Sequence, residues 1–305
     1  MEITSLPDWL PDEDGLITHY IKLYPDRIKV IRYKTPYAKE QNQILTAHTR
    51  AAWLQDEEIT ADSLLSSIQR SKTRLADLVI CNEFNLFVTL TLNCIGCVPK
   101  CKNRPCTCDK KTCTRYNLDY AIRTVKGWYN NQIKKHGRFP YVQVMELHKD
   151  KGYHFHALFK DYPGNLKYWK RDNSDGRPLY NLQSYRKGWT TAKKIYDISG
   201  TSSYIRKYIM KDMPLFPGQK RYWCSQGLKR PIIVQDDQLA EQILSDLNSE
   251  TWKPAHIELT VNDELKTNTS NIESITTLMV DNKQNYEYEL QVLECLEDIT
   301  KNFGK

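Results

Sequence analysis

The 305-residue sequence contains no run of about 18 apolar residues, the length that a membrane-spanning helix requires. Its N-terminal stretch, MEITSLPDWLPDEDG, is acidic and lacks the hydrophobic core of a secretory signal peptide. No internal repeat, low-complexity segment or ATPase P-loop motif is present. These absences argue against a membrane protein, a secreted protein and a self-contained ATPase, so we expect a cytoplasmic protein.

The composition is that of a folded chain. Hydrophobic residues make up 40% of the sequence, and 7 Trp and 19 Tyr supply large side chains for a core. A chain of this length can form one large domain with an appendage or two modest domains.

Charge is distributed unevenly. Residues 235–305 contain 15 Asp and Glu against 5 Lys and Arg, a net charge of −10. Because the whole chain carries +7, residues 1–234 carry +17. This asymmetry is typical of a nucleic-acid-binding body with an acidic tail. A solvated basic surface is the alternative.

The spacing of apolar residues predicts three helices, at 61–81, within 114–136 and at 201–213, with Gly137 ending the second. Segments rich in β-branched and aromatic residues predict strands at 27–33, 84–93, 141–148 and 153–159. The last two are joined by Lys149–Gly152 and predict a β-hairpin. Residues 160–200 are interpreted as a basic, loop-rich stretch. This order of elements predicts an α+β domain on an antiparallel sheet.

The predicted hairpin carries a candidate metal site. His154 and His156 are two residues apart on a strand, so their imidazoles project from the same face. If His148 faces His154 across the turn, Glu146 faces His156 on that face. Two imidazoles and a carboxylate can hold Mg²⁺ or Mn²⁺ against a phosphate oxygen. His148 is a second candidate ligand, although we favour its interpretation as a partly exposed strand histidine.

The helix expected at 201–213 carries two tyrosines, Tyr204 and Tyr208, one turn apart on one face, and each is followed three residues later by a lysine, Lys207 or Lys211. A tyrosine with a pKa near 10 is a poor nucleophile at neutral pH. A metal that polarises a phosphate and a nearby ammonium would compensate. The alternative is a helix that packs its tyrosines into the core.

Three segments in this order, FVTLTLN, MELHKDKGYHFHALF and YIRKYIMKDM, resemble the motifs of the His-hydrophobic-His (HUH) endonuclease superfamily. The similarity is greatest to replication-associated proteins of rolling-circle plasmids and small phages of Gram-positive bacteria. NLQSYRKGWTTAKKI and RYWCSQGLKRP also resemble segments of that family. The resemblance covers about residues 63–234. It implies a five-stranded antiparallel sheet with helices on one face, in a protein of the bacterial host cytoplasm.

The resemblance also implies roles for individual residues. His154 and His156 match the paired metal-binding histidines, and Glu146 matches the polar third ligand. Tyr208 with Lys211 matches the nucleophile pattern, and Tyr204 matches the second tyrosine of the two-tyrosine subgroup. The implied function is initiation of rolling-circle DNA replication. Single-stranded DNA, at or near an origin hairpin, is nicked and joined through a 5′-phosphotyrosine.

Two rival functions remain at this stage. The same chemistry serves transposases and conjugative relaxases, and the catalytic motifs do not separate these from replication initiators. A different class is a non-catalytic, zinc-containing DNA-binding protein. Because the sequence has no P-loop, replication would need a host helicase as well as a host polymerase.

A cysteine cluster departs from the family pattern. Its six members follow the spacing CxxC-x3-C-x4-CxC-x4-C and are Cys94, Cys97, Cys101, Cys106, Cys108 and Cys113. In a cytosolic chain such a cluster favours metal binding over disulfides. Two closely spaced pairs can donate four thiolates to a structural Zn²⁺, although which four bind cannot be read from the spacing. The alternative is an insertion loop of reduced thiols.

The segment RYWCSQGLKRP interleaves aromatic and basic residues, as single-strand binders do. Its candidate DNA contacts are Arg221, Tyr222, Trp223, Lys229 and Arg230. A turn that packs against the sheet through its two aromatic residues is an equal alternative.

The sequence therefore divides into three expected regions. Residues 1–62 have no assigned role, residues 63–234 form the endonuclease domain with the cysteine-rich insertion at 94–113, and residues 235–305 form an acidic appendage. The amphipathic piece Tyr286–Ile299 in the appendage can compete with DNA for the basic body, bind a host replication partner, or pack as an extra helix.

Overall fold

The computed structural model describes residues 16–38, 61–94, 113–147, 152–207, 220–246, 252–255 and 272–280. The chain forms two compact units. One unit comprises Leu64–Arg230, and the other combines Met1–Ser63 with Pro231–Lys305. None of the described helices has both the length and the apolar character needed to cross a membrane.

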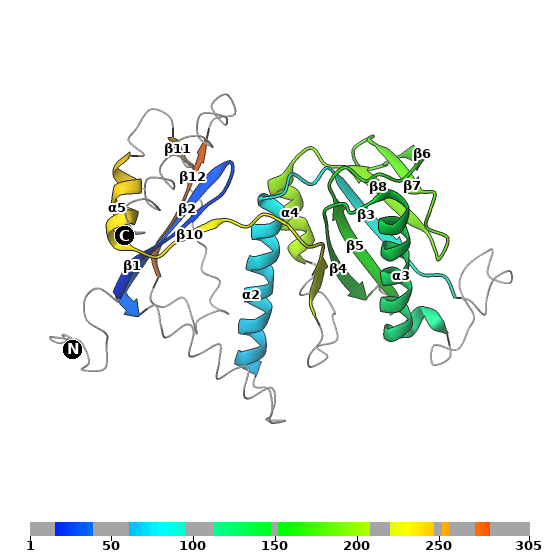
Figure 1. Ribbon diagram of the computed structural model, residues 1–305, viewed down its shortest axis with the longest axis horizontal. Helices are drawn as coiled ribbons and strands as arrows, with labels where there is room; N and C mark the ends of the chain where they lie inside the picture. The colour runs from blue at the N-terminus through cyan, green and yellow to red at the C-terminus, as the bar shows by residue number, and fades with distance from the viewer. Residues whose placement is uncertain are drawn as a thin grey trace. The chain divides into compact units, whose positions relative to one another are not determined.

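Within the described residues, the Leu64–Arg230 unit is built on one sheet of seven strands, all paired antiparallel (Figure 1). In spatial order the strands are β6 (Leu166–Arg171), β7 (Pro178–Leu182), β8 (Thr190–Lys194), β3 (Leu86–Thr91), β5 (Tyr153–Phe159), β4 (Tyr141–Leu147) and β9 (Tyr222–Cys224). The predicted α+β class with an antiparallel sheet is confirmed. The sheet has seven strands, however, where the resemblance implies five.

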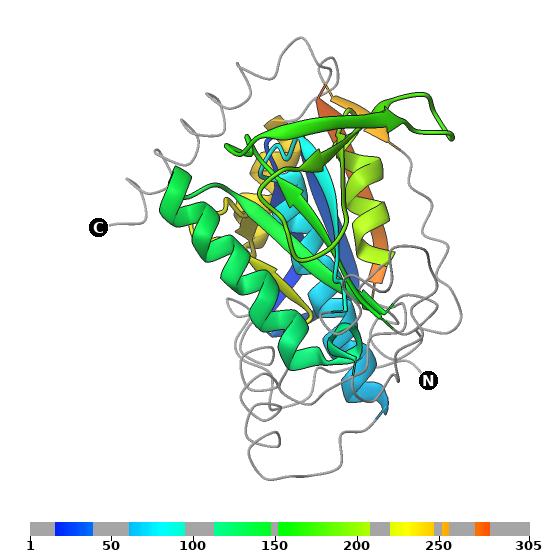
Figure 2. The same cartoon turned by 90° about the vertical axis from the view of Figure 1, so that its right-hand side faces the viewer.

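Helices cover both faces of this sheet, where the resemblance implies one face (Figures 1 and 2). Helix α3 (Leu118–His136) packs on one face, and its buried residues join a core with alternate residues of β3 and β5. Helices α2 (Ala61–Ile80) and α4 (Ile198–Lys207) cover the other face. That second core contains Leu75, Leu78, Val79, Val142, Val144, Leu158 and Ile205. Alternation along β4 and β5 sends side chains into both cores, so each face has an apolar surface to bury.

Helix α3 shows why the sequence predicts this helix correctly. The side chain of Asn117 accepts a hydrogen bond from the backbone N–H of Tyr120 (2.8 Å) and thereby caps the helix. Gly137 ends it at φ +88°, a backbone conformation that glycine adopts without steric cost. Its last turn contains Lys134 and Lys135, whose positive charges suit a helix C-terminus.

Strands β6, β7 and β8 correct the loop interpretation of residues 160–200. The side chains of β6, with the sequence LKYWKR, are almost all exposed. An exposed strand buries too few side chains to impose the alternation of apolar and polar residues that reveals a half-buried strand. The sequence pattern therefore does not predict β6, although the backbone of β6 pairs with β7 over most of its length.

The other unit is a five-stranded antiparallel sheet among its described residues. Its order is β10 (Ile232–Val234), β1 (Leu16–Leu23), β2 (Arg27–Ala38), β12 (Ile272–Val280) and β11 (Trp252–Ala255). Regions 1–62 and 235–305 thus contribute strands to the same sheet. Helix α5 (Asp237–Asp246) packs on it, and the Asp237 carboxylate accepts hydrogen bonds from the backbone N–H groups of Thr18 and His19. The Tyr286–Ile299 piece lies outside the described residues.

Candidate active site on the seven-stranded sheet

The hairpin β4–β5 is confirmed, but its register differs from the prediction. Glu146 lies opposite His154, and Val144 lies opposite His156. The prediction places Glu146 opposite His156, a displacement of two residues along one strand. The strands end at Leu147 and begin again at Tyr153, so a longer connection than the expected four-residue turn sets the register. A shift of two preserves the face, and Glu146, His154 and His156 still share it.

Strand β3 continues this surface on the other side of β5. Thr91 lies opposite His154, and Thr89 lies opposite His156. On β8, Thr191 lies opposite Thr89. Directly paired residues of antiparallel strands share a face. His154 and Thr91 therefore belong to one row of side chains across the sheet, and His156 and Thr89 belong to the next.

His156 is held between two polar side chains. Its Nε2 lies 2.7 Å from Oε2 of Glu146, and its Nδ1 lies 3.2 Å from Oγ1 of Thr89. His156 is 6% exposed and Glu146 is 8% exposed. Because an ionised carboxylate only accepts hydrogen bonds, Nε2–H donates to Glu146 in this arrangement. Contacts at both nitrogens fix the orientation of the imidazole ring.

The expected metal ligands are therefore placed on one face, with two of them in direct contact. Glu146 and His156 supply a carboxylate oxygen and an imidazole nitrogen close enough to serve as neighbouring ligands of one ion. His154 lies directly across from Glu146 in the ladder. Among the described residues, no three His, Cys, Asp or Glu side chains form a group that could hold a metal. His148 lies outside the described residues.

Tyr204 is placed over the histidine face by helix α4. Its ring meets the ring of Phe87 edge-on, with centroids 5.5 Å apart. The ring of Phe87 in turn lies 5.9 Å from that of His156. Tyr204 is 48% exposed, so this tyrosine is not packed into the core. The structure thus brings Tyr204 to the same side of β3 as His156, with one aromatic ring between them.

The remaining residues of the expected tyrosine motif are described less fully. Lys207 is the last residue of α4, and only its backbone is described. Tyr208 and Lys211 lie outside the described residues. The helix predicted at 201–213 is therefore confirmed as far as Lys207, and it begins earlier than predicted, at Ile198.

The aromatic residues of RYWCSQGLKRP belong to strand β9. Tyr222 packs with the core under α2 and α4, whereas Trp223 packs with the core under α3. They point to opposite faces of the strand, so they cannot both stack on one DNA strand. Burial raises the pKa of Tyr222 and lowers the pKa of Arg221. Lys229 and Arg230 are exposed and can contact phosphate.

The two ends of the cysteine cluster are described. Cys94 is 7% exposed and Cys113 is 4% exposed. Cys97, Cys101, Cys106 and Cys108 lie outside the described residues, and the proposed zinc site with them.

Comparison with known families bears on the region that carries these residues. Residues 85–213 match the family described as replication-associated protein ORF2. The matched region begins just before β3, passes through the histidine hairpin and ends after α4. The chain is therefore similar to replication-associated proteins, which supports a role in DNA replication. No curated protein and no solved structure matches the chain.

Sequence reasoning misses two residues of this site, Thr89 and Phe87. Both contact the imidazole of His156, and both belong to the FVTLTLN segment, to which the sequence assigns a buried strand and no role at the site. Their alternation with the buried Leu86, Val88 and Leu90 places them on the opposite face of β3. That alternation is a usable signal, but assigning them to the site also requires the pairing of β3 with β5.

Proposed function

We propose that this protein initiates rolling-circle DNA replication by cutting and rejoining single-stranded DNA through an active-site tyrosine. The observation that carries the proposal is the buried contact between His156 and Glu146, on a face shared with His154 and approached by Tyr204. All four residues lie inside the region that matches replication-associated proteins.

Glu146 and His156 would hold a Mg²⁺ or Mn²⁺ ion. His154 lies on the same face but does not form a three-residue group with them in this structure, so its side chain would have to turn toward the ion to become the remaining ligand. When bound, the ion polarises the scissile phosphate. Thr89 has a separate task. By contacting Nδ1 of His156, it holds the ring with Nε2 toward Glu146. Nε2 can bind a metal only after it has lost its proton, so in the loaded site Nδ1 would carry the proton and donate it to Oγ1 of Thr89.

The tyrosine carries the covalent step. The hydroxyl oxygen of Tyr208 bonds to phosphorus, and the bond from phosphorus to the 3′ oxygen breaks. The hydroxyl proton of the tyrosine finishes on that 3′ oxygen, which leaves a 5′-phosphotyrosine and a free 3′-OH. Lys211 stabilises the charge that develops during attack. Tyr204, with Lys207, performs the second transfer that releases a circle.

The products determine the partners. A host polymerase extends the free 3′-OH, and a host helicase opens the duplex because the sequence carries no P-loop. The phosphotyrosine retains the energy of the phosphodiester, so rejoining needs no nucleotide cofactor. Arg221, Lys229 and Arg230, in a region with a net charge of +17, would contact the phosphates of the bound strand. These reactions take place in the host cytoplasm.

The test is incubation of the protein with a pool of end-labelled single-stranded DNA of random sequence, in Mn²⁺, followed by a denaturing gel. The wild-type protein should yield a shortened strand and a covalent protein–DNA adduct. Mass spectrometry should locate the nucleotide on Tyr208 or Tyr204. Tyr208→Phe should remove most nicking, and Tyr204→Phe should chiefly reduce strand transfer.

The controls separate the enzyme from a non-catalytic DNA-binding protein. Tyr204→Phe keeps the aromatic ring that meets Phe87, so its effect reports the hydroxyl group rather than the packing. The His154→Ala/His156→Ala double variant should bind DNA without cutting it. Undiminished cleavage by this double variant, or an adduct on neither tyrosine, would exclude the proposed mechanism.

A further inference from the structure

Trp189, which has no role in the proposed chemistry, lies next to the row of side chains that contains His154 and Thr91. Trp189 immediately precedes β8, and its backbone carbonyl accepts a hydrogen bond from the backbone N–H of Thr91 (2.9 Å). Its own N–H donates to Oγ1 of Thr91 (2.9 Å). Thr91 is also the residue opposite His154. Trp189 therefore extends the row of His154 and Thr91, about 10 Å from His154 at two strand spacings.

The position of Trp189 is fixed by a close backbone approach. A Cβ on the preceding residue, Gly188, would lie 2.0 Å from the carbonyl oxygen of Thr91. Only glycine lets the chain come this near to β3. Trp189 is nevertheless 43% exposed. Its position is therefore set by its backbone hydrogen bonds to Thr91 and not by burial of its side chain in the core.

A second exposed indole lies next to the first. The rings of Trp169 and Trp189 have centroids 5.0 Å apart and planes at 77°. Trp169 is 38% exposed and lies on β6 at the irregularity between Tyr168 and Lys170. Because the rings are nearly perpendicular, one base cannot stack on both. The Nζ atom of Lys170 lies 4.6 Å from the ring centre of Trp169 and places a positive charge at this pair.

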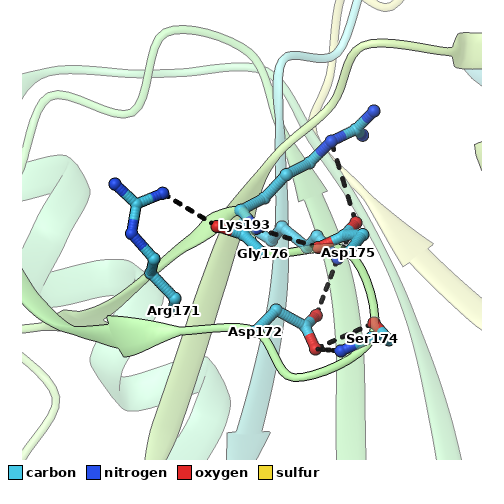
Figure 3. A network of polar contacts seen from close by, with 7 residues as sticks. Arg171, Asp172, Ser174, Asp175, Gly176 and Lys193 are labelled. Atoms are coloured by element: carbon cyan, nitrogen blue, oxygen red, sulfur yellow. Dashed lines mark hydrogen bonds and ion pairs between the residues drawn. The ribbon is translucent and has the colours of Figure 1, made fainter.

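An ion-pair network secures the hairpin that carries Trp169 (Figure 3). Nζ of Lys193, on β8, lies 2.7 Å from Oδ2 of Asp172 and 2.6 Å from Oδ2 of Asp175, both in the β6–β7 turn. This network ties the turn to β8 and offsets its negative charges. Basic residues close to the two tryptophans in sequence are exposed, namely Lys167, Lys170, Arg186 and Lys187.

We propose that Trp169 and Trp189 form a base-stacking site for an unpaired DNA strand that crosses β3 and β8 from His154 toward β6. Exposed aromatic rings among basic side chains are the combination with which proteins hold single strands, since rings stack on bases and cations contact phosphates. The site deepens the proposed function, because it would hold nucleotides adjacent to the phosphate positioned at the histidines. It is distinct from the Arg221–Arg230 segment, whose aromatic rings pack into the two cores.

The test measures binding without cleavage. A fluorescent oligothymidylate is titrated with the full chain in buffer without Mg²⁺ or Mn²⁺, and its anisotropy is followed. The Trp169→Ala/Trp189→Ala double variant should bind about 10- to 100-fold more weakly than the wild type. Tyr168→Ala is the matched control, because Tyr168 is a 56% exposed neighbour on β6 whose ring contacts Tyr180 instead. This control should bind like the wild type.

A DNA oligonucleotide with abasic sites in place of its bases tests whether the two tryptophans bind bases. The wild type should bind it much more weakly than the oligothymidylate, whereas the double variant should bind the two strands equally. Trp169→Phe/Trp189→Phe, which retains aromatic rings, should restore much of the affinity and exclude a mere folding defect. If the wild type binds both strands equally, the indoles serve another partner, such as a protein, and the proposal is wrong.

The result is independent of the chemistry. Base-dependent binding that requires the indoles, in a protein that forms no covalent adduct, would retain the stacking site and reject the nicking function. If the Trp169→Ala/Trp189→Ala variant forms the covalent adduct and binds DNA as tightly as the wild type, the nicking function is retained and the stacking site is rejected.

Discussion

Nε2 of His156 lies 2.7 Å from Oε2 of Glu146, and the two residues are 6% and 8% exposed. A buried imidazole and a buried carboxylate stabilise the fold only as a pair, since each alone would leave a polar group without adequate compensation. In the proposed site the same two side chains would also bind the metal, so folding and metal binding would depend on the same pair.

Glu146→Gln tests both roles. It keeps the size of the side chain but removes its charge, so we expect a loss of about 1–3 kcal/mol in the free energy of unfolding. Urea unfolding without added Mg²⁺ or Mn²⁺ measures this loss, and calorimetric titration with Mn²⁺ should show weakened binding. Glu83→Gln is the control, because the ion pair of Glu83 with Lys160 is at the surface and Glu83 is 81% exposed. Equal losses of stability in the two variants would contradict the buried pairing.

The cysteine cluster should contain a structural zinc ion. We expect about one zinc per chain in protein purified without added metal, and a Cys94→Ser/Cys97→Ser variant should lose it. Elemental analysis measures the content directly. Cys224→Ser is the control, since Cys224 lies outside the cluster on β9. A wild-type zinc content near zero would favour the loop of reduced thiols.

Local signals account for the parts of the fold that the sequence predicts. Helix α3 has a capping Asn117 and a terminating Gly137, and β3, β4 and β5 have the β-branched and aromatic residues typical of buried strands. His154 and His156 are two residues apart on a strand, and this spacing alone places them on one face. These features depend on residues that are neighbours in sequence, so they can be read from one sequence.

Pairing between distant segments accounts for the rest. The contact of Thr89 with His156 joins residues 67 positions apart, and no periodicity reports it. The pairing of β2 with β12 joins the N-terminal and C-terminal regions in the same way. The prediction misses β6 for a different reason. The side chains of β6 are almost all exposed, so its sequence lacks the alternation of apolar and polar residues on which strand prediction relies.

Lys193 should make the attachment of the β6–β7 turn depend on pH at both extremes. The hydrogen bond from Lys193 lowers the pKa values of Asp172 and Asp175, with further bonds from Ser174 to Asp172 and from the Arg177 N–H to Asp175. Burial acts to lower the pKa of Lys193, but its bonds to the two carboxylates outweigh burial and raise it. The carboxylate contribution is therefore lost as pH falls below about 4, and the lysine contribution as pH rises above about 10.4.

Lys193→Met removes the ammonium group and keeps a similar stem. The variant should be slightly less stable than the wild type, by a constant margin between about pH 5 and 9, and the margin should shrink outside that window. Urea unfolding of both proteins across pH measures it. A margin that increases on acidification would show that these ion pairs do not hold the turn.

Gly188→Ala should displace the segment that positions Trp189. The new Cβ would lie 2.0 Å from the carbonyl oxygen and 2.7 Å from the carbonyl carbon of Thr91, and neither backbone atom can move aside cheaply. We expect a loss of about 1–3 kcal/mol in the free energy of unfolding, the usual cost of overpacking. DNA affinity should fall, as we expect for the loss of the Trp189 ring, because the backbone bonds between Trp189 and Thr91 would be strained or broken.

Gly127→Ala is the matched control and should change stability in the opposite direction. Gly127 is exposed within α3, and a Cβ there meets nothing within 4 Å. Replacing glycine by alanine inside a helix stabilises it by about 0.5–1 kcal/mol, because the unfolded chain loses conformational freedom. Urea unfolding compares the two variants, and anisotropy compares their DNA binding. If Gly188→Ala were as stable and bound DNA as well as Gly127→Ala, the close approach to Thr91 would not be what positions Trp189.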